Sequence, residues 1–317
     1  MGFYVLRRVI YALPIALSVT VVCFLLVHIA PGDPLNAVAP ADAPVEVINA
    51  LKVAYGFDQP LPVQYFRWLG RALAGDLGTS VATGRPVLAE VMTAVVNTIL
   101  LAVFAAVLGF SLGAVLGGMA GYRHKGIVDR IATALSVIGV SVPHYWLGMV
   151  LTIIFSSKLN WLPAMGAGPG GSKEWLWDAE HLRYLVLPVT TLAVIPLGIV
   201  TRTIRALVAD ILSKDFVQAL RAKGMSDRAV FLHVVKNVAP TALAVMGLQL
   251  GYLLGGSILV ETVFAWPGSG FLLNTAIFQR DLPLLQGTIL ILCMIFVLLN
   301  LLVDIIQPAI DPRMRRS

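Results

Sequence analysis

The residue types that carry chemistry are few in this chain, and they form none of the familiar catalytic patterns. Its five histidines are scattered, so no HExxH motif is present to hold a catalytic zinc ion. The serine-hydrolase pattern GxSxG is broken in the sequence GVSVPH at residues 139–144. The phosphate-binding pattern GxxxxGK(S/T) is absent, and the dipeptide Gly-Lys occurs nowhere. Cys23 and Cys293 lie in apolar runs and imply neither a disulfide nor a metal site. We therefore expect no enzyme, cofactor or metal, and any ATP would be hydrolysed by another chain.

The composition places the chain in a membrane. Only 13% of its residues are charged and its mean hydropathy is +0.86, whereas soluble domains carry about 25% charged residues. A spanning helix needs about 20 mostly apolar residues. Six stretches meet this need: residues 9–29, 98–120, 131–156, 185–200 with its polar continuation, 241–260 and 288–306. The fourth is the shortest and contains Pro188 and Pro196. The sequence thus predicts an all-α integral membrane protein with six transmembrane helices.

Ionisable side chains are almost missing from these six runs. Of the His, Asp, Glu, Lys and Arg residues, only His28, His144 and Asp304 fall inside them, and the first and last lie near the ends of their runs. Ion-coupled carriers usually keep carboxylates or a proton relay within the membrane, so this scarcity argues against an ion-driven pump. His144 is expected to be a packed or pore-facing hydrogen-bonding residue, not a ligand.

The distribution of positive charge predicts the orientation of the helices. With six spans, both termini and the second and fourth loops share one side, which holds 15 of the 23 Lys and Arg residues. The positive-inside rule makes that side the cytoplasm, with both termini there and residues 30–97 outside. Arg7 and Arg8 before an apolar run could begin a signal peptide, but a run of about 20 residues is longer than the roughly 7–15 usual for a signal. The net charge of +6 reflects this bias, and we expect no nucleic-acid partner.

Glycine recurs at every fourth position along two of the predicted spans. The residues are Gly109, Gly113, Gly117 and Gly121 in the second span and Gly247, Gly251 and Gly255 in the fifth. Small residues at this spacing let helix backbones approach closely, so we expect both stripes to be helix-packing surfaces. The pattern alone does not say whether the partner helix belongs to this chain or to another.

The longest cytoplasmic loop, SKDFVQALRAKGMSDRAVFLHVVKNVAP at residues 213–240, predicts two short helices, here called the knob. Ser213 is a suitable N-cap, and Phe216, Ala219 and Leu220 recur at helical spacing. Gly224 can take the left-handed position that ends a helix.

The second helix of the knob begins where Ser226 can cap it and is expected to end at Pro240. Its apolar face contains Val230, Phe231, Val234, Val235 and Val238. A DNA-reading helix-turn-helix has a similar outline. In a loop of a membrane protein with several spans, a knob that docks into a soluble partner fits better.

These residues resemble a known family. ALRAKG at residues 219–224, followed by a second helix and a proline, is similar to the EAA loop by which type I ABC importer permeases dock into their ATPases. Four stretches narrow the match to the dipeptide/oligopeptide branch: APGDP (30–34), YGFDQPLPVQYFRWLGRALAGDLGTS (55–80), SVPHYWLG (141–148), and ETVFAWPGSGFL (261–272) with RDLPLLQG (280–287). The resemblance covers nearly the whole chain in the right order. One departure is that Gln218, Ala219 and Leu220 stand where the general loop begins Glu-Ala-Ala.

The resemblance implies a type I ABC importer permease fold in the plasma membrane of a prokaryote. Its expected partners are a second, similar permease, two ABC ATPases, an extracytoplasmic binding protein and membrane lipid. The residues expected to couple to the ATPases are Asp215, Phe216, Ala219, Leu220, Arg221, Lys223, Gly224, Ser226, Asp227 and Arg228.

The insert at residues 261–286 lies outside between the last two spans, where such a permease receives its substrate. We expect it to shape the extracytoplasmic mouth of the pathway, although a structural plug or hairpin is the alternative. The mouth candidates are Glu261, Phe264, Trp266, Pro267, Gly268, Gly270, Phe271, Arg280 and Asp281.

The whole sequence is interpreted as a non-catalytic permease subunit that imports dipeptides or oligopeptides by ATP-driven alternating access. The expected division is residues 1–96 for the first helix and an extracytoplasmic segment, 97–306 for a five-helix core with a coupling loop at 207–240, and 307–317 for a cytoplasmic tail. Haem or nickel import remains an alternative. A channel or scaffold would not need the knob, and an exporter would not need the long outside loop.

Overall fold

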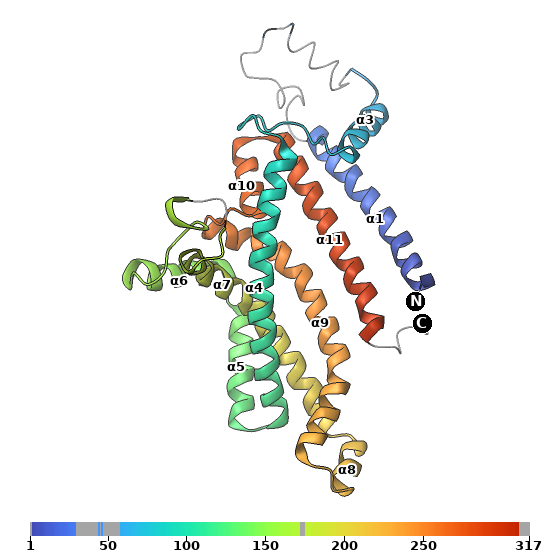
Figure 1. Ribbon diagram of the computed structural model, residues 1–317, viewed down its shortest axis with the longest axis vertical. Coiled ribbons are helices and arrows are strands. Elements are labelled where there is room, and N and C mark those ends of the chain that lie inside the picture. Colours follow the sequence, from blue (N-terminus) through green and yellow to red (C-terminus); the bar gives the residue numbers. More distant parts are fainter. Residues whose placement is uncertain (1, 30–43, 45, 47–57, 172–174, 311–317) are drawn as a thin grey trace. The chain divides into compact units, whose positions relative to one another are not determined.

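The computed structural model of the chain describes residues 2–29, 44, 46, 58–171 and 175–310. Helices make up most of this part (Figure 1). The ones long and apolar enough to cross a membrane are α1 (Gly2–Ile29), α4 (Val87–Tyr122), α7 (Ala179–Leu212), α9 (Asp227–Val263) and α11 (Leu282–Ile310). These are five helices, and the described residues hold six spans if a bent helix pair counts as one. The predicted all-α membrane class is confirmed.

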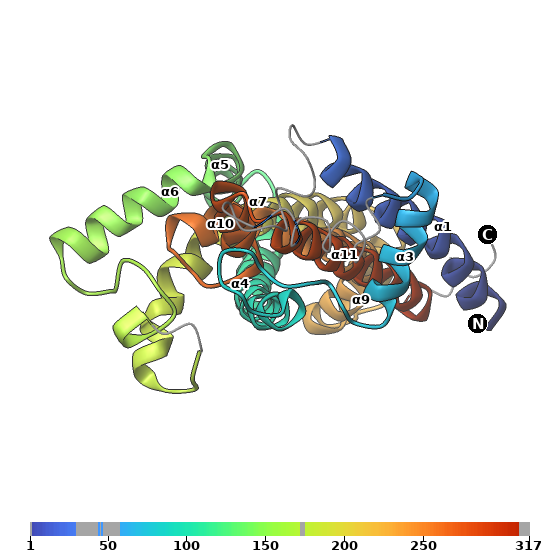
Figure 2. The same ribbon diagram turned by 90° about the horizontal axis from the view of Figure 1, so that it is seen from above.

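The third predicted span is not one straight helix. It is divided into α5 (Ile127–Ser141) and α6 (His144–Leu151), the latter continued by a π-helical stretch (Thr152–Lys158), with a bend of 99° between the two parts. The break falls at Val142, which is extended, and Pro143. The residue before a proline avoids the helical region, and proline has no N–H to donate. The expectation of one continuous helix was wrong, and Figure 2 shows α6 leading away from the end of α5.

Other prolines do not interrupt their helices. Pro188 and Pro196 lie inside α7, and Pro240 lies inside α9. The prediction that Pro240 ends a helix was therefore wrong. Val238 and Ala242, on either side of this proline, pack into a buried cluster that holds the helix across it.

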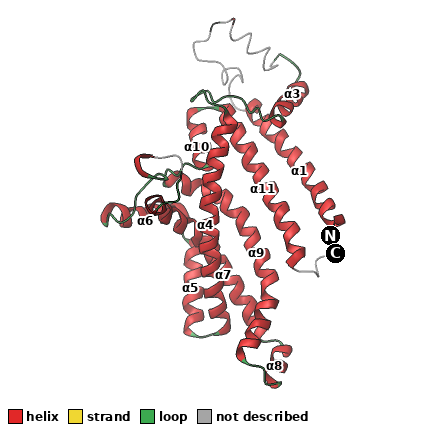
Figure 3. Cartoon of the chain, in the orientation of Figure 1, coloured by secondary structure: helices red, strands yellow, loops and turns green. Residues whose placement is uncertain are grey.

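The described residues contain no β-strand (Figure 3). An isolated bridge joins Thr79 and Pro86 in the connection between α3 (Leu61–Leu73) and α4. The remaining helical elements are α8 (Asp215–Ala222), α10 (Ser269–Gln279) and a 3-10 turn at Pro169–Gly171.

By its internal contacts the chain divides into two compact units. The first, here called the α7 unit, comprises Ile99–Trp266 and the described residues from Leu302 onward, so it contains α5 to α9. The second, here called the α1 unit, comprises Gly2–Thr98 and Pro267–Leu301, so it contains α1, α3 and α10. The boundaries fall inside α4 and α11.

The glycine stripe of α4 faces α7 within the α7 unit. A Cβ atom added at Gly117 would lie 2.5 Å from the Thr201 carbonyl oxygen. One added at Gly121 would lie 2.7 Å from the Arg205 carbonyl oxygen. The other two members of the stripe also come close to the α7 backbone: Gly109 and Gly113. The partner helix of this stripe belongs to the same chain.

The glycines of α9 do not share one neighbour. A Cβ atom at Gly247 would lie 2.7 Å from a methyl carbon of Val303 in α11, which belongs to the same unit. Gly251 is buried, whereas Gly255 is exposed and has open space where its Cβ would be. Along α9, a neighbouring helix therefore comes close at Gly247 but not at Gly255.

In the α1 unit, α1 is packed against α3, a helix that the sequence analysis did not predict. The Phe24 ring lies 5.5 Å from the Tyr65 ring and 5.9 Å from the Trp68 ring, measured between centroids. The Thr20 and Tyr65 hydroxyls are 2.8 Å apart. His28, one of the rare polar residues of the first span, pairs with the Gln64 amide oxygen at 3.1 Å.

Candidate coupling site

The knob begins directly after α7. Ser213 still has helical backbone angles and ends α7, where its hydroxyl donates to the Asp210 carbonyl oxygen at 2.8 Å. Lys214 is extended and precedes α8, which has no side-chain cap. The prediction of Ser213 as an N-cap was wrong, because α7 continues through the residues that were read as a loop.

The elbow between α8 and α9 is a glycine C-cap. Gly224 has φ of +76°, which confirms the predicted left-handed position. The Gly224 N–H donates to the Arg221 carbonyl at 2.9 Å, and the Met225 N–H donates to the Leu220 carbonyl at 3.2 Å. These two bonds are the Schellman pattern, which satisfies the carbonyls left open at the end of a helix. The elbow therefore has a fixed geometry.

The second helix of the knob is the start of α9. The Ser226 hydroxyl accepts from the Ala229 N–H at 3.4 Å, as the sequence predicted. Because α9 continues unbroken to Val263, this helix is joined to a membrane span without an intervening loop.

The inner face of the knob is held by valines. Val217 of α8 and Val230 of α9 are fully buried. Val234 and Val238 join a cluster with Val200, Ile204, Val208 and Ala242 from α7 and α9. Val217 was missed in the sequence because α8 carries apolar residues on two faces, and their spacing alone does not choose between them. The predicted face of α9 divides, with Phe231 and Val235 exposed.

The outer face of the knob holds the predicted coupling residues. All of them except the half-buried Leu220 are exposed: Asp215, Phe216, Ala219, Arg221, Lys223, Gly224, Ser226, Asp227 and Arg228. The face thus presents an aromatic ring, Phe216, among three positive and two negative side chains. A surface of this kind can insert an apolar anchor into a pocket while its rim pairs with acidic groups.

Three of the predicted mouth residues belong to the α7 unit and are fully buried: Glu261, Phe264 and Trp266. The Phe264 carbonyl accepts from the Gly166 N–H at 2.8 Å. A Cβ atom added at Gly148 would lie 3.1 Å from the Phe264 ring. These side chains therefore pack the interior of the unit.

The other predicted mouth residues belong to the α1 unit: Pro267, Gly268, Gly270, Phe271, Arg280 and Asp281. The Pro267 carbonyl accepts from the Asn97 amide at 2.9 Å. Asp281 is buried and accepts from the Ser80 hydroxyl at 2.5 Å and from the Ala82 and Leu284 N–H groups at 3.1 Å. Its carboxylate caps α11 and holds the connection before α4, whereas Arg280 is exposed.

Comparison with known proteins decides the family. Residues 113–316 match the family described as binding-protein-dependent transport system inner membrane component, and residues 1–106 match its N-terminal membrane component. Over 313 residues the chain is 38% identical to the glutathione transport system permease protein GsiC of Salmonella paratyphi A, covering 98% of each chain. The protein of the same name from Escherichia coli K12 is 37% identical over 313 residues, again covering 98% of each. The chain belongs to this family of inner membrane components.

Family membership confirms the predicted type I ABC importer permease. As a member of this family, the chain is a multi-pass protein of the plasma membrane and a component of transport, not a catalyst. The exposed face of the knob carries both apolar and charged side chains, and the second helix of the knob continues directly into a span.

Proposed function

We propose that this permease forms half of a pathway for ATP-driven import of small peptides, and that its knob docks into an ATPase subunit. The observation that carries the proposal is the continuity of α9 between the exposed knob and the membrane. The 37 residues of α9 extend for about 55 Å at 1.5 Å per residue. This exceeds the roughly 30 Å of a hydrocarbon core, so α9 reaches well beyond the bilayer.

A rigid connection of this kind transmits motion. A displacement of α8 by an ATPase acts on α9 through the packing of the two helices and the fixed elbow at Gly224, since no flexible loop lies between the elbow and the span. On the docking face, Phe216 supplies the anchor, and Arg221, Lys223 and Arg228 pair with acidic groups of the ATPase.

The complete importer requires a second permease, two ATPases and an extracytoplasmic binding protein. In this arrangement residues 97–306 form the transport core, and residues 1–96 add a helix and an extracytoplasmic segment. Residues 261–286 lie at the extracytoplasmic entrance. The burial of Phe264, Trp266 and Asp281 supports a structural role for them, in which they fix the shape of the entrance from behind.

The substrate class follows from the relatives. Those at 38% and 37% identity are named for glutathione, a tripeptide, which favours a small peptide over haem or nickel. A channel without ATP coupling gains no support, because it would have no use for the knob.

The test is transport by a reconstituted complex of this permease with the second permease, the ATPases and the binding protein. We expect ATP-dependent accumulation of labelled glutathione or of a dipeptide in vesicles only when the binding protein is present. Equal uptake without ATP would contradict the importer, and uptake of haem or nickel alone would contradict the peptide assignment.

A further inference from the structure

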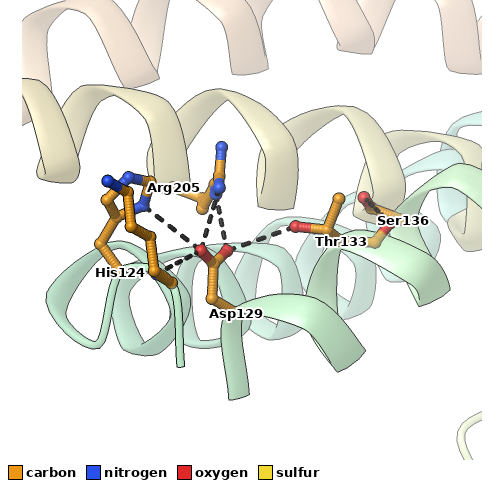
Figure 4. Close-up of polar contacts among 6 residues, drawn as sticks. His124, Asp129, Thr133, Ser136 and Arg205 are labelled. Carbon is orange, nitrogen blue, oxygen red and sulfur yellow. Dashed lines mark hydrogen bonds and ion pairs between the residues drawn. The ribbon is translucent and has the colours of Figure 1, made fainter. Parts of the chain in front are cut away.

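A buried carboxylate joins the turn between α4 and α5 to α7. Asp129, in the first turn of α5, is almost fully buried. Its two oxygens accept from the Arg205 guanidinium of α7, at 2.7 Å from Nε and 2.9 Å from Nη2 (Figure 4). This bidentate geometry is the strongest form of a side-chain ion pair. It links two residues that are 76 positions apart.

The same carboxylate also holds the α4–α5 turn. It accepts from the Lys125 backbone N–H at 2.9 Å and from the Thr133 hydroxyl at 3.3 Å, and the His124 ring nitrogen lies 3.3 Å away (Figure 4). Lys125 has φ of +64°, a conformation that non-glycine residues rarely adopt. Asp129 therefore fixes the turn as well as its attachment to α7.

The backbones of the three helices also meet closely around this pair. A Cβ atom at Gly121 of α4 would lie 2.7 Å from the Arg205 carbonyl oxygen. A Cβ atom at Gly198 of α7 would lie 2.7 Å from the Ser136 carbonyl oxygen of α5. The pair thus closes a tight three-helix packing of α4, α5 and α7.

The α7 end of this packing leads directly to the knob. One turn beyond Arg205, Val208 lies in the buried cluster with Val234 and Val238 of α9. α7 ends at Leu212, and α8 begins at Asp215 after two intervening residues. A short, packed stretch of α7 therefore connects Arg205 with the knob.

We propose that the Asp129–Arg205 pair is the joint that makes α4 and α5 follow the movement of α7 when the knob is displaced. Both are positioning residues for coupling, and the proposal rests on the docking function of the knob. A buried ion pair is not needed for stability alone, since apolar replacements are often equally stable. What the pair adds is a fixed position of the turn along α7, because both hydrogen bonds form in only one alignment.

The test measures transported substrate per ATP hydrolysed in the reconstituted complex. Asp129→Asn keeps the shape of the side chain but removes its charge. It also replaces one carboxylate oxygen, which accepts a hydrogen bond from Arg205, with an amide N–H₂ group that can only donate. We expect the ATPases to co-purify as in the wild type and hydrolysis to continue, while transport per ATP falls at least fivefold. A merely structural role would lower the yield of complex, with transport and hydrolysis falling together.

The control is Glu180→Gln, the same change of carboxylate to amide on the same helix. Glu180 is exposed in the first turn of α7, at the end far from the knob, so this variant should leave the ratio unchanged. If Asp129→Asn fails to assemble, Arg205→Lys keeps the charge but loses the two-pronged contact, and a smaller fall in the ratio is expected. An unchanged ratio in whichever variant assembles with bound ATPases would overturn the joint while leaving knob docking intact. Loss of ATPase binding on alteration of the knob tests the docking function separately.

Discussion

At Gly224, the backbone strain caused by a substituted side chain can be separated from the contacts that this side chain would make. The residue has φ of +76°, and a Cβ atom placed there would meet nothing within 4 Å. Within this chain, a substitution therefore acts through the backbone conformation alone. A β-branched residue is strongly disfavoured in this region, whereas asparagine adopts it more readily.

We predict that Gly224→Val opens the elbow, at a cost of about 1–2 kcal/mol or more to the native turn, and detaches the knob from its ATPases. Membrane insertion should be unaffected, because the spans are untouched. Co-purification of the ATPases and substrate-stimulated ATP hydrolysis measure the effect. Gly224→Asn is the matched control and should retain both. Normal association in the valine variant would disprove docking through this elbow.

The sequence predicts the conformation and contacts of some single residues but not of others. The left-handed Gly224 and the cap at Ser226 follow from local rules of helix ends, and both are present in the structure. The pairing of Asp129 with Arg205 was not predicted, because no local rule relates residues so far apart. Ser213 was misjudged because a good capping residue can also end the preceding helix.

Among the helices, a proline in the sequence does not by itself predict whether the helix is interrupted. Pro143 breaks a span, whereas Pro188, Pro196 and Pro240 lie within continuous helices. The difference lies in packing, since Val238 and Ala242 hold α9 across Pro240. Hydropathy places the apolar runs correctly, but it does not contain this tertiary information.

The glycine stripe of α4 supplies a prediction about helix packing. Gly117→Ala would bring a methyl group 2.5 Å from the Thr201 carbonyl, and overpacking of this kind typically costs about 1–3 kcal/mol. We expect a lower apparent Tm in detergent and less assembled complex. Gly118→Ala on the same helix is the control, because its Cβ would meet nothing within 4 Å. Its better helix propensity, worth up to about 1 kcal/mol, should leave the Tm equal or higher. Equal Tm values for the two variants would contradict close packing of α4 on α7.

For the whole molecule, the composition predicts the fold class correctly. A chain with 13% charged residues and long apolar runs has few alternatives to a bundle of membrane helices. The charge distribution adds a predicted orientation, because the expected six-span topology assigns 15 of the 23 Lys and Arg residues to the side of the knob. How α4 and α7 pack had to come from the structure, since a glycine stripe does not name its partner.

The orientation can be measured with single cysteines in a background where Cys23 and Cys293 are replaced by alanine. Val81 is exposed in the connection between α3 and α4, and Gln218 is exposed in α8. The positive-inside rule places Val81 outside and Gln218 in the cytoplasm. We expect a membrane-impermeant maleimide to label Val81→Cys in intact cells, and to label Gln218→Cys only after the membrane is opened. The cysteine-free parent should remain unlabelled throughout. Labelling of Gln218→Cys but not Val81→Cys in intact cells would reverse the orientation, and a knob outside the cell could not meet a cytoplasmic ATPase.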